Sequence, residues 1–430
     1  MNDLRSYKWS LRSDLIKSAA RSFIIRAVGI ASTYIFSIFV LSEFDIESWG
    51  RITMLFTIIQ VVSLFLRAGT DKETMLKFSS KSPNAISYYS KSLSQIALHS
   101  AVILACLAVY FLAEGTVVFH NWNLIYIFIG ATALSILMLH SELLRGLKKV
   151  GWYSFFEKGG IFTLTAIIGF VSFLTISSTE FNIFNLVLAI VLLCFLAFFV
   201  SKKAIQKLPD NVISKELYLE SPLKLGLPLM LSGAGFMIMN WTDLFIINAN
   251  HGDEAVGLFN ICSRIASLSA FALLAVNTVN GPKISELFNK KEMKQLEKYV
   301  QHSNKITAIV SLIVGIIIFI FPNSFLLAFG VNTPDNTVIN CLFLLVVGEI
   351  INASCGSIGL LLQATGHRQQ FQIIVFISTF ISILLGLLFV PKYGIVGGAF
   401  ANASATAIWN ISAFIYAQKK LNIKLFFNKT

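Results

Sequence analysis

Apolar residues lie along this chain in long runs that are separated by short polar stretches. A helix needs about 20 mostly apolar residues to cross the hydrocarbon core of a bilayer. That rule predicts about twelve spanning helices, with the ranges 18–42, 49–70, 92–113, 122–143, 159–178, 181–201, 224–249, 255–282, 306–322, 338–363, 370–391 and 394–417. Only the polar stretch 177–180 separates the fifth span from the sixth.

The composition agrees with this pattern. Hydrophobic residues make up 56% of the 430 residues, charged residues make up 13%, and the mean hydropathy is +0.74. A soluble domain usually carries about 25% charged residues. The chain is therefore expected to be an all-α polytopic membrane protein. Its five cysteines lie inside apolar runs without metal-ligand spacing, which is typical of small buried hydrophobic residues.

The distribution of Lys and Arg predicts the orientation, because cytoplasmic loops are enriched in these residues. Of the 34 basic residues, 30 fall on one side of the predicted bilayer, in the two tails, in alternate connections or in the first turns of the adjoining spans. The opposite connections hold Arg51 and Lys392, and Arg67 and Arg264 lie inside spans. A missed or invented span would move every later loop to the wrong side. We therefore expect both termini in the cytoplasm. The net charge of +12 is explained by this topology, so we expect no nucleic-acid partner.

An internal repeat is visible at an offset of 207 residues. The stretch 47–51 (Glu-Ser-Trp-Gly-Arg) resembles the stretch 254–258 (Glu-Ala-Val-Gly-Leu), and each of them begins a span. An even number of spans per half predicts a parallel repeat, as in some transporters. We expect two six-helix bundles around a central cavity, residues 1–208 and residues 224–430, joined by a cytoplasmic linker, residues 209–223.

Charged residues inside spans are costly unless they are paired, so they are candidates for function. Arg26 and Arg67 either line a cavity or reach the inner surface with their long side chains. Asp243 and Arg264 either form a neutralising ion pair or face a hydrated cavity. Glu349, near the middle of its span, is a candidate proton site.

Amide side chains and the longest inner loop complete the polar features. Asn240 and Asn277 lie inside spans and either bond between helices or line the cavity. The loop 283–305 alternates basic and acidic residues and predicts an amphipathic surface helix that attaches to anionic lipids. The chain lacks a nucleophile–base pair, a zinc-ligand set and a phosphate loop, which predicts neither an enzyme nor a bound metal or cofactor.

Several segments carry a resemblance to a known family. They are 226–232 (Gly-Leu-Pro-Leu-Met-Leu-Ser), 255–260 (Ala-Val-Gly-Leu-Phe-Asn), 281–284 (Gly-Pro-Lys-Ile) and 391–399 (Pro-Lys-Tyr-Gly-Ile-Val-Gly-Gly-Ala). In their order and spacing the chain resembles the Wzx-type polysaccharide flippases, which transport O-antigen or capsule repeat units. This family belongs to the multidrug/oligosaccharidyl-lipid/polysaccharide exporter superfamily.

The resemblance implies a function. A Wzx-type flippase moves an undecaprenyl-pyrophosphate-linked oligosaccharide across the bacterial inner membrane by alternating access, for polysaccharide or lipopolysaccharide assembly. It works beside membrane lipids, polysaccharide polymerase and glycosyltransferases. The resemblance implies that Arg26, Arg67 and Arg264 hold the pyrophosphate, that Asp243 tunes the pocket, and that Glu349 couples transport to protons.

Two other functions are weighed against this one. An ion-coupled small-molecule antiporter of the multidrug type predicts a smaller, apolar and acidic pocket. The excess of arginines over carboxylates within the spans favours the flippase instead. A membrane glycosyltransferase or polymerase predicts a large outer loop with catalytic carboxylates. The longest outer loop, about 322–337, carries only Asp335.

Overall fold

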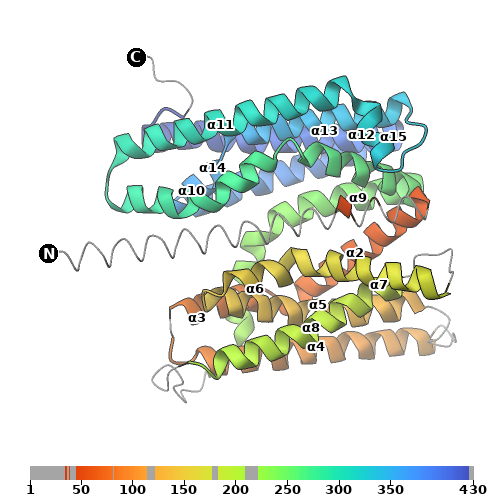
Figure 1. Cartoon of the computed structure of the whole chain (residues 1–430). Helices are drawn as coiled ribbons and strands as arrows, with labels where there is room; N and C mark the ends of the chain where they lie inside the picture. The colour runs from red at the N-terminus through yellow and green to blue at the C-terminus, as the bar shows by residue number, and fades with distance from the viewer. Residues whose placement is uncertain are drawn as a thin grey trace. The chain divides into compact units, whose positions relative to one another are not determined.

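The structure is a computed structural model that describes residues 34–35, 38, 45–80, 82–113, 122–176, 183–208 and 221–425. No strand occurs among these residues, and helices account for nearly all of them (Figure 1). The chain divides into two compact units. Unit 1 comprises residues 1–44 and 55–233, and unit 2 comprises residues 45–54 and 234–430. The expectation of an all-α polytopic membrane fold is confirmed.

Unit 1 holds most of the helices of the N-terminal half. They are α2 (Ile46–Arg67, from Leu55 onward), α3 (Thr70–Ser79), α4 (Ala85–Ala113), α5 (Trp122–Gly146), α6 (Val150–Ser154), the π-helix η2 (Phe155–Gly159), α7 (Gly160–Ile176), α8 (Ile183–Ile205) and the start of α9 (Pro222–Ser267). Helix α5 lies at the centre of this unit and packs against α3 and α8 (Figure 1). Its buried leucines, with Phe156 and Ile190, form the core.

Unit 2 holds the helices of the C-terminal half and the first residues of α2. They are the rest of α9, α10 (Phe271–Asn289), α11 (Met293–Ile320), α12 (Pro322–Ala328), α13 (Asn336–Cys355), α14 (Ile358–Ala364) and α15 (Arg368–Leu421). Helix α13 packs against α11 and α15. After α15 the chain lies along α11, where Gln301 donates a hydrogen bond of 2.7 Å to the carbonyl of Lys424 and the side chain of Leu425 is buried.

Two long helical elements each contain a reversal at a glycine. Helix α9 is interrupted at Gly252 (φ 77°) and α15 at Gly394 (φ 57°), in backbone conformations that favour glycine. The ring of His251 is 2.8 Å from the carbonyl oxygen of Val390, so the two reversals lie together. These reversals separate the spans expected at 224–249 and 255–282, and those expected at 370–391 and 394–417.

Six helices in the described part of the chain are long and apolar enough to cross a membrane, and up to eight spans result if each bent pair counts as one. The predicted span 18–42 lies outside the described residues except at 34–35 and 38, which are helical. The span expected at 255–282 is broken, because α9 ends at Ser267 and α10 begins at Phe271 with a 60° bend. The number of twelve stays a prediction.

The loop 283–305 does not form the single surface helix that its charge pattern predicted. Helix α10 continues to Asn289, Lys291 turns the chain with φ 59°, and α11 begins at Met293. The charges of this region pair locally: Glu286 accepts hydrogen bonds from Lys283 and Lys290. Pairs at these helical spacings stabilise the end of α10 instead of a separate helix.

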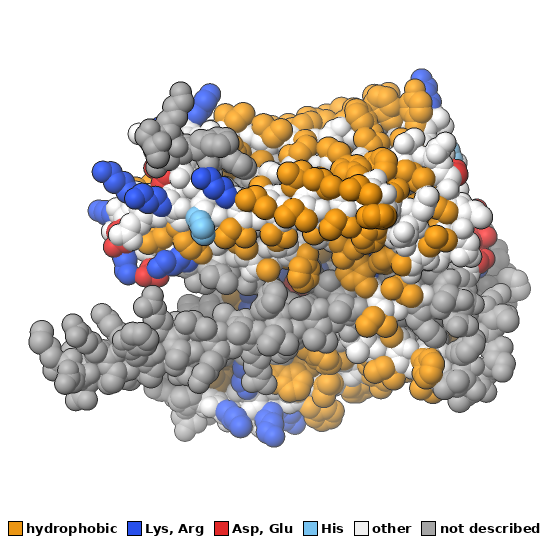
Figure 2. Space-filling view, turned by 45° about the horizontal axis from the view of Figure 1, so that its top comes forward, with side chains coloured by type: hydrophobic (Ala, Val, Ile, Leu, Met, Phe, Trp, Pro, Cys, Tyr) orange, Lys and Arg blue, Asp and Glu red, His pale blue; other side chains and the backbone are white. Residues whose placement is uncertain are grey.

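Large apolar side chains remain on the outside of both units. Phe195 and Phe199 of α8 and Ile320 of α11 are each 62% exposed. Figure 2 shows hydrophobic side chains covering a broad continuous area, with many of the Lys and Arg side chains at its ends. A lipid environment accounts for such a surface, whereas a soluble monomer rarely exposes one. Of the five free cysteines, Cys262, Cys341 and Cys355 are buried as expected, but Cys106 is exposed.

Candidate functional site

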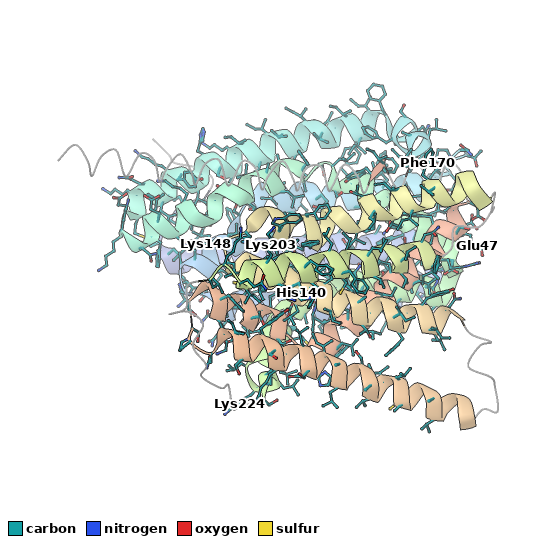
Figure 3. The ribbon with its side chains drawn as sticks, turned by 60° about the horizontal axis from the view of Figure 1, so that its bottom comes forward. Glu47, His140, Lys148, Phe170, Lys203 and Lys224 are labelled. Atoms are coloured by element: carbon teal, nitrogen blue, oxygen red, sulfur yellow. The ribbon has the colours of Figure 1, made fainter. Side chains whose placement is uncertain are left out.

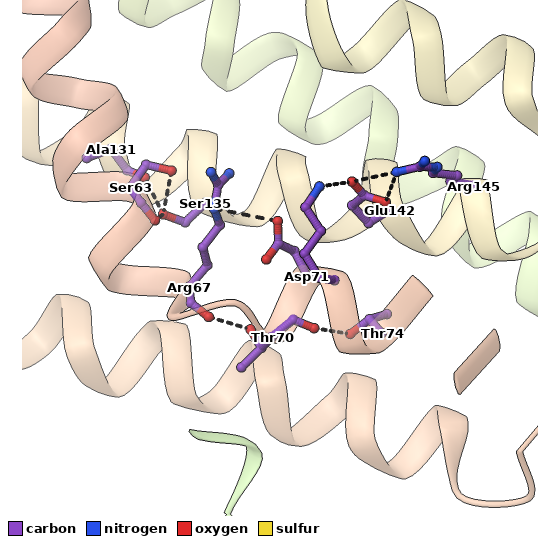
Figure 4. Close-up of polar contacts among 10 residues, drawn as sticks. Ser63, Arg67, Thr70, Asp71, Thr74, Ala131, Ser135, Glu142 and Arg145 are labelled. Atoms are coloured by element: carbon purple, nitrogen blue, oxygen red, sulfur yellow. Dashed lines mark hydrogen bonds and ion pairs between the residues drawn. The ribbon is translucent and has the colours of Figure 1, made fainter. Parts of the chain in front are cut away.

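In unit 1, Arg67 is the last residue of α2 and is buried. A tight turn follows it, in which Ala68 (φ 44°) and Gly69 (φ 77°) take positive φ angles before α3 begins. The Nε atom of Arg67 is 3.6 Å from the Oδ2 atom of Asp71, whose side chain is also buried (Figure 4). Thr70 donates a hydrogen bond of 2.7 Å to the Arg67 carbonyl. Arg67 is therefore paired inside the unit and does not reach out to the surface.

A second ionic group lies next to this pair on α3 and α5. The carboxylate of Glu142 is buried and is bonded to Lys72 and to Arg145, the latter at 3.3 Å (Figure 4). The guanidinium of Arg145 stacks over the ring of Tyr153 at 4.9 Å from its centroid. This arrangement ties α3, α5 and α6 together. Sequence reasoning missed Asp71 and Glu142, because both lie at the edges of predicted spans.

In unit 2, Asp243 of α9 is 1% exposed. Its Oδ2 atom accepts a hydrogen bond of 2.7 Å from Asn402 of α15, and its Oδ1 atom has no hydrogen-bond partner. The side chain of Ser382, also on α15, lies close to the same carboxylate. An isolated carboxylate in such a place favours binding of a proton or a small cation. The hydrogen bond that the structure shows at Asp243 joins it to Asn402, and the two interpretations of Asp243 stay predictions.

Arg264 lies in the second half of α9, and two side chains hold it. Its Nε atom donates a hydrogen bond of 2.9 Å to Asn260, one helical turn earlier. Its guanidinium stacks over the ring of Trp49 at 4.9 Å from the centroid. Trp49 comes from the first turns of α2, which belong to unit 2. The internal repeat includes Trp49, but we did not predict its contact with Arg264 from the sequence.

Glu349 is half-buried in α13 and takes part in a chain of amides. Asn352 donates a hydrogen bond of 3.0 Å to its carboxylate, and Asn410 of α15 donates to Asn352 at 3.3 Å. The Oδ1 atom of Asn410 is buried without a hydrogen-bond partner. Glu349 is thus connected to α15 through Asn352 and Asn410, whereas Asp243 is bonded to a different residue of α15, Asn402.

The asparagines predicted inside spans behave differently from one another. Asn277 accepts a hydrogen bond of 2.5 Å from Ser357, which also accepts one of 2.6 Å from Asn280. Asn280 is buried and accepts a hydrogen bond of 2.9 Å from Tyr299. These residues form a satisfied network between α10, α11 and the α13–α14 break. Asn240 is exposed.

Within unit 2, the predicted site residues that the structure describes do not form one hydrogen-bonded cluster. Arg26 lies outside the described residues, and Arg67 belongs to unit 1. Asp243, Arg264, Asn277 and Glu349 belong to separate hydrogen-bonded groups in unit 2. No group of three or more His, Cys, Asp or Glu side chains within the described ranges could hold a metal ion. The guanidinium of Arg264 can bind an anion, and the carboxylates of Asp243 and Glu349 can bind a proton or a cation.

The helical units and their exposed apolar surfaces define a multi-pass α-helical membrane protein. Over 94% of this chain and 88% of the other, it superposes on a structure described as "Lipid II flippase MurJ, inward closed conformation", with a TM-score of 0.70 and 16% identity. It also superposes on an inward-facing multidrug resistance MATE family transporter of the MOP superfamily, over 93% of this chain and 98% of the other, with a TM-score of 0.68 and 15% identity.

Sequence comparisons match parts of the chain. The MatE family model matches residues 228–388, less than half of the chain. The "Probable low-salt glycan biosynthesis flippase Agl15" of Haloferax volcanii is 25% identical over 199 residues, which is 45% of this chain and 41% of that protein. An uncharacterised membrane protein of Methanocaldococcus jannaschii is 24% identical over 45% of this chain and 44% of its own length. The chain thus spans less than half the length of the curated relatives that it matches.

Proposed function

We propose that this protein is a flippase that moves a lipid-linked oligosaccharide across the membrane by alternating access. The proposed substrate is an undecaprenyl-pyrophosphate-linked repeat unit, taken from the inner to the outer leaflet of the inner membrane for surface polysaccharide assembly. Both termini then lie in the cytoplasm, and the two six-helix bundles, residues 1–208 and 224–430, enclose the sugar. Polymerase and glycosyltransferases are the proposed partners, and the protein is not an enzyme.

The observation that carries the proposal is Arg264, a guanidinium kept inside a membrane-spanning bundle by Trp49 and Asn260. A cation is costly in hydrocarbon and marks an ion or substrate path by default. A guanidinium also matches the geometry of phosphate oxygens better than an ammonium does. The similarity of 199 residues to a protein named as a glycan biosynthesis flippase supports the same substrate class.

Buried carboxylates are proposed to couple this movement to an ion. Asp243 is the stronger candidate, because its Oδ1 atom lacks a hydrogen-bond partner. Glu349 is the second, because Asn352 already donates to its carboxylate. Loading and release of a proton or sodium ion at Asp243 would change the charge between α9 and α15, which is the kind of event that biases a two-state transporter.

A second candidate is an ion-coupled small-molecule antiporter. The MatE match over residues 228–388 and the superposition on a MATE transporter favour it. The two candidates differ in what they must bind. A flippase needs a cation for a pyrophosphate, whereas an exporter of cationic drugs needs an acidic pocket without one.

The experiment combines complementation with a direct assay. A strain without this gene receives the parent, Arg264→Ala, Arg264→Lys or Asp243→Asn, and surface polysaccharide is measured at equal protein level. The flippase proposal expects loss with Arg264→Ala and Asp243→Asn, and partial recovery with Arg264→Lys. Purified protein in liposomes should then move a fluorescent lipid-linked oligosaccharide. Unchanged polysaccharide in every variant, with altered drug resistance, would replace the flippase by the antiporter.

A further inference from the structure

Five lysines of unit 1 gather where α5 and α8 end. Helices α5 and α8 run in the same direction: Gly130 lies against Val187, and the ring of His140 lies 6.0 Å from that of Phe198. Their C-terminal ends therefore lie together. The group, called the lysine surface below, consists of Lys148 and Lys149 after α5 and Lys202, Lys203 and Lys207 at and after the end of α8. Figure 3 labels Lys148 and Lys203 at these two ends.

None of these five lysines forms an ion pair with a carboxylate in the part of the chain that the structure describes. Other lysines of the same unit do: Lys72 is bonded to Glu142, and Lys77 lies 3.9 Å from Glu73. Like charges also lie close together on the lysine surface. Partial burial of Lys149 and the nearby charge of Lys207 both lower the pKa of Lys149. An arrangement of this kind is relieved by an external anion.

The surroundings of the lysine surface are suited to a lipid. Trp152, one turn after Lys149, is 44% exposed and stacks on Phe156 with ring centroids 5.6 Å apart. Exposed tryptophan is typical of the membrane–water interface. On α8, the strongly exposed Phe195 and Phe199 precede the lysines by one to three turns. The ligand that fits has a negative headgroup and apolar chains in the same molecule.

We propose that the lysine surface binds the headgroups of anionic phospholipids in the predicted inner leaflet. Clusters of basic residues next to a spanning helix attract such lipids. Lys283 and Lys290 near the end of α10 are not equivalent, because each of them is paired with the carboxylate of Glu286. The proposed lipid site therefore lies in unit 1. The inference is independent of what the protein transports.

The test measures lipid retention by the purified full-length protein in nanodiscs and by native mass spectrometry. Phosphatidylglycerol is compared with phosphatidylcholine. The variant Lys149→Gln/Lys207→Gln is compared with Lys283→Gln/Lys290→Gln, which removes the same charge from paired lysines. A variant with all five lysines changed to glutamine gives the full effect, expected to be at least about a tenfold loss of phosphatidylglycerol affinity. The double variants retain enough basic residues to preserve the charge bias that orients the chain.

The expected result is a severalfold loss of phosphatidylglycerol retention in Lys149→Gln/Lys207→Gln and little change in Lys283→Gln/Lys290→Gln. Equal losses in both double variants would overturn the proposal, because net charge alone would then explain them. Inorganic phosphate or pyrophosphate that displaces phosphatidylglycerol at similar concentration would also overturn it, since the ligand would be a soluble anion. Retention that is the same for both lipids has the same consequence.

Discussion

Replacing Gly50 with alanine tests a close contact between two helix backbones in unit 2. Gly50 lies in the first turns of α2 and packs against α9 where α9 resumes after Gly252. A Cβ atom at Gly50 would be 1.7 Å from the carbonyl oxygen of Asp253 and 2.9 Å from the backbone nitrogen of Gly257. These atoms are backbone atoms, so no side-chain rotation can relieve the clash.

The size of the effect follows from the distance. A carbon and an oxygen atom in contact are ordinarily about 3.3 Å apart, so the two helices must separate by roughly 1.6 Å. Overpacking of this kind costs about 1–3 kcal/mol. For a unit of this size each kcal/mol lowers the melting temperature by about 2–4 °C. We expect Gly50→Ala to lower the Tm of the purified protein by several degrees.

Gly257→Ala provides an independent version of the same test. Its Cβ atom would be 2.4 Å from the carbonyl oxygen of Ile46. Because both substitutions force the same two helices apart, the Tm loss in the double variant should be smaller than the sum of the two single losses.

Gly281 of α10 is the matched control. A Cβ atom there has no neighbour within 4 Å, so Gly281→Ala should leave the Tm unchanged or raise it, since alanine favours a helix over glycine by up to about 1 kcal/mol. Thermal unfolding in detergent, followed by tryptophan fluorescence, measures all four variants. If Gly50→Ala melts at the same temperature as Gly281→Ala, the close crossing is refuted.

Two further predictions concern unit 2. Asn280→Ala leaves the hydroxyl partners of this buried amide unsatisfied, which costs about 1–3 kcal/mol. The Tm of this variant should therefore fall. The Tm of the control Asn240→Ala, at an exposed position, should stay at the parent value. Hydrogen bonds from Lys290 and Lys283 lower the pKa of Glu286 to about 2, so the stabilisation it gives is present above the ordinary glutamate pKa and lost as pH falls toward 2. Lys283→Gln/Lys290→Gln should therefore shift the loss of helix protection at the end of α10, measured by hydrogen exchange, to higher pH.

The sequence was sufficient for the fold class and for the main helices, because their signal is local. A run of apolar residues without charge needs no partner to be recognised, and α8, α11 and α13 lie where such runs predicted spans. The charge pattern of residues 283–305 led to a wrong prediction of one surface helix, because a local pattern does not show where one helix ends and the next begins. It describes which faces are polar, but the positive φ of Lys291 decides that two helices meet there.

The candidate site was less predictable, because its contacts join distant parts of the chain. The depths of Asp243 and Arg264 in the bilayer allowed an ion pair between them. In the structure, Asp243 accepts a hydrogen bond from Asn402 of α15. Sequence spacing cannot predict which residue bonds to Asp243, because the partner depends on how α9 and α15 pack. A polar residue in an otherwise apolar run, such as Asn402, was the available signal.

The internal repeat explains why Arg264 meets Trp49. The repeat aligns Gly50 with Gly257 at an offset of 207 residues, and these two glycines touch each other in the structure. Arg264 lies seven residues after Gly257 and so on the same face of α9. Trp49 directly precedes Gly50. The close crossing of two backbones therefore brings the tryptophan ring to 4.9 Å from the guanidinium. A substitution that separates the helices should also release Arg264, so Gly257→Ala is expected to impair transport even where enough folded protein remains.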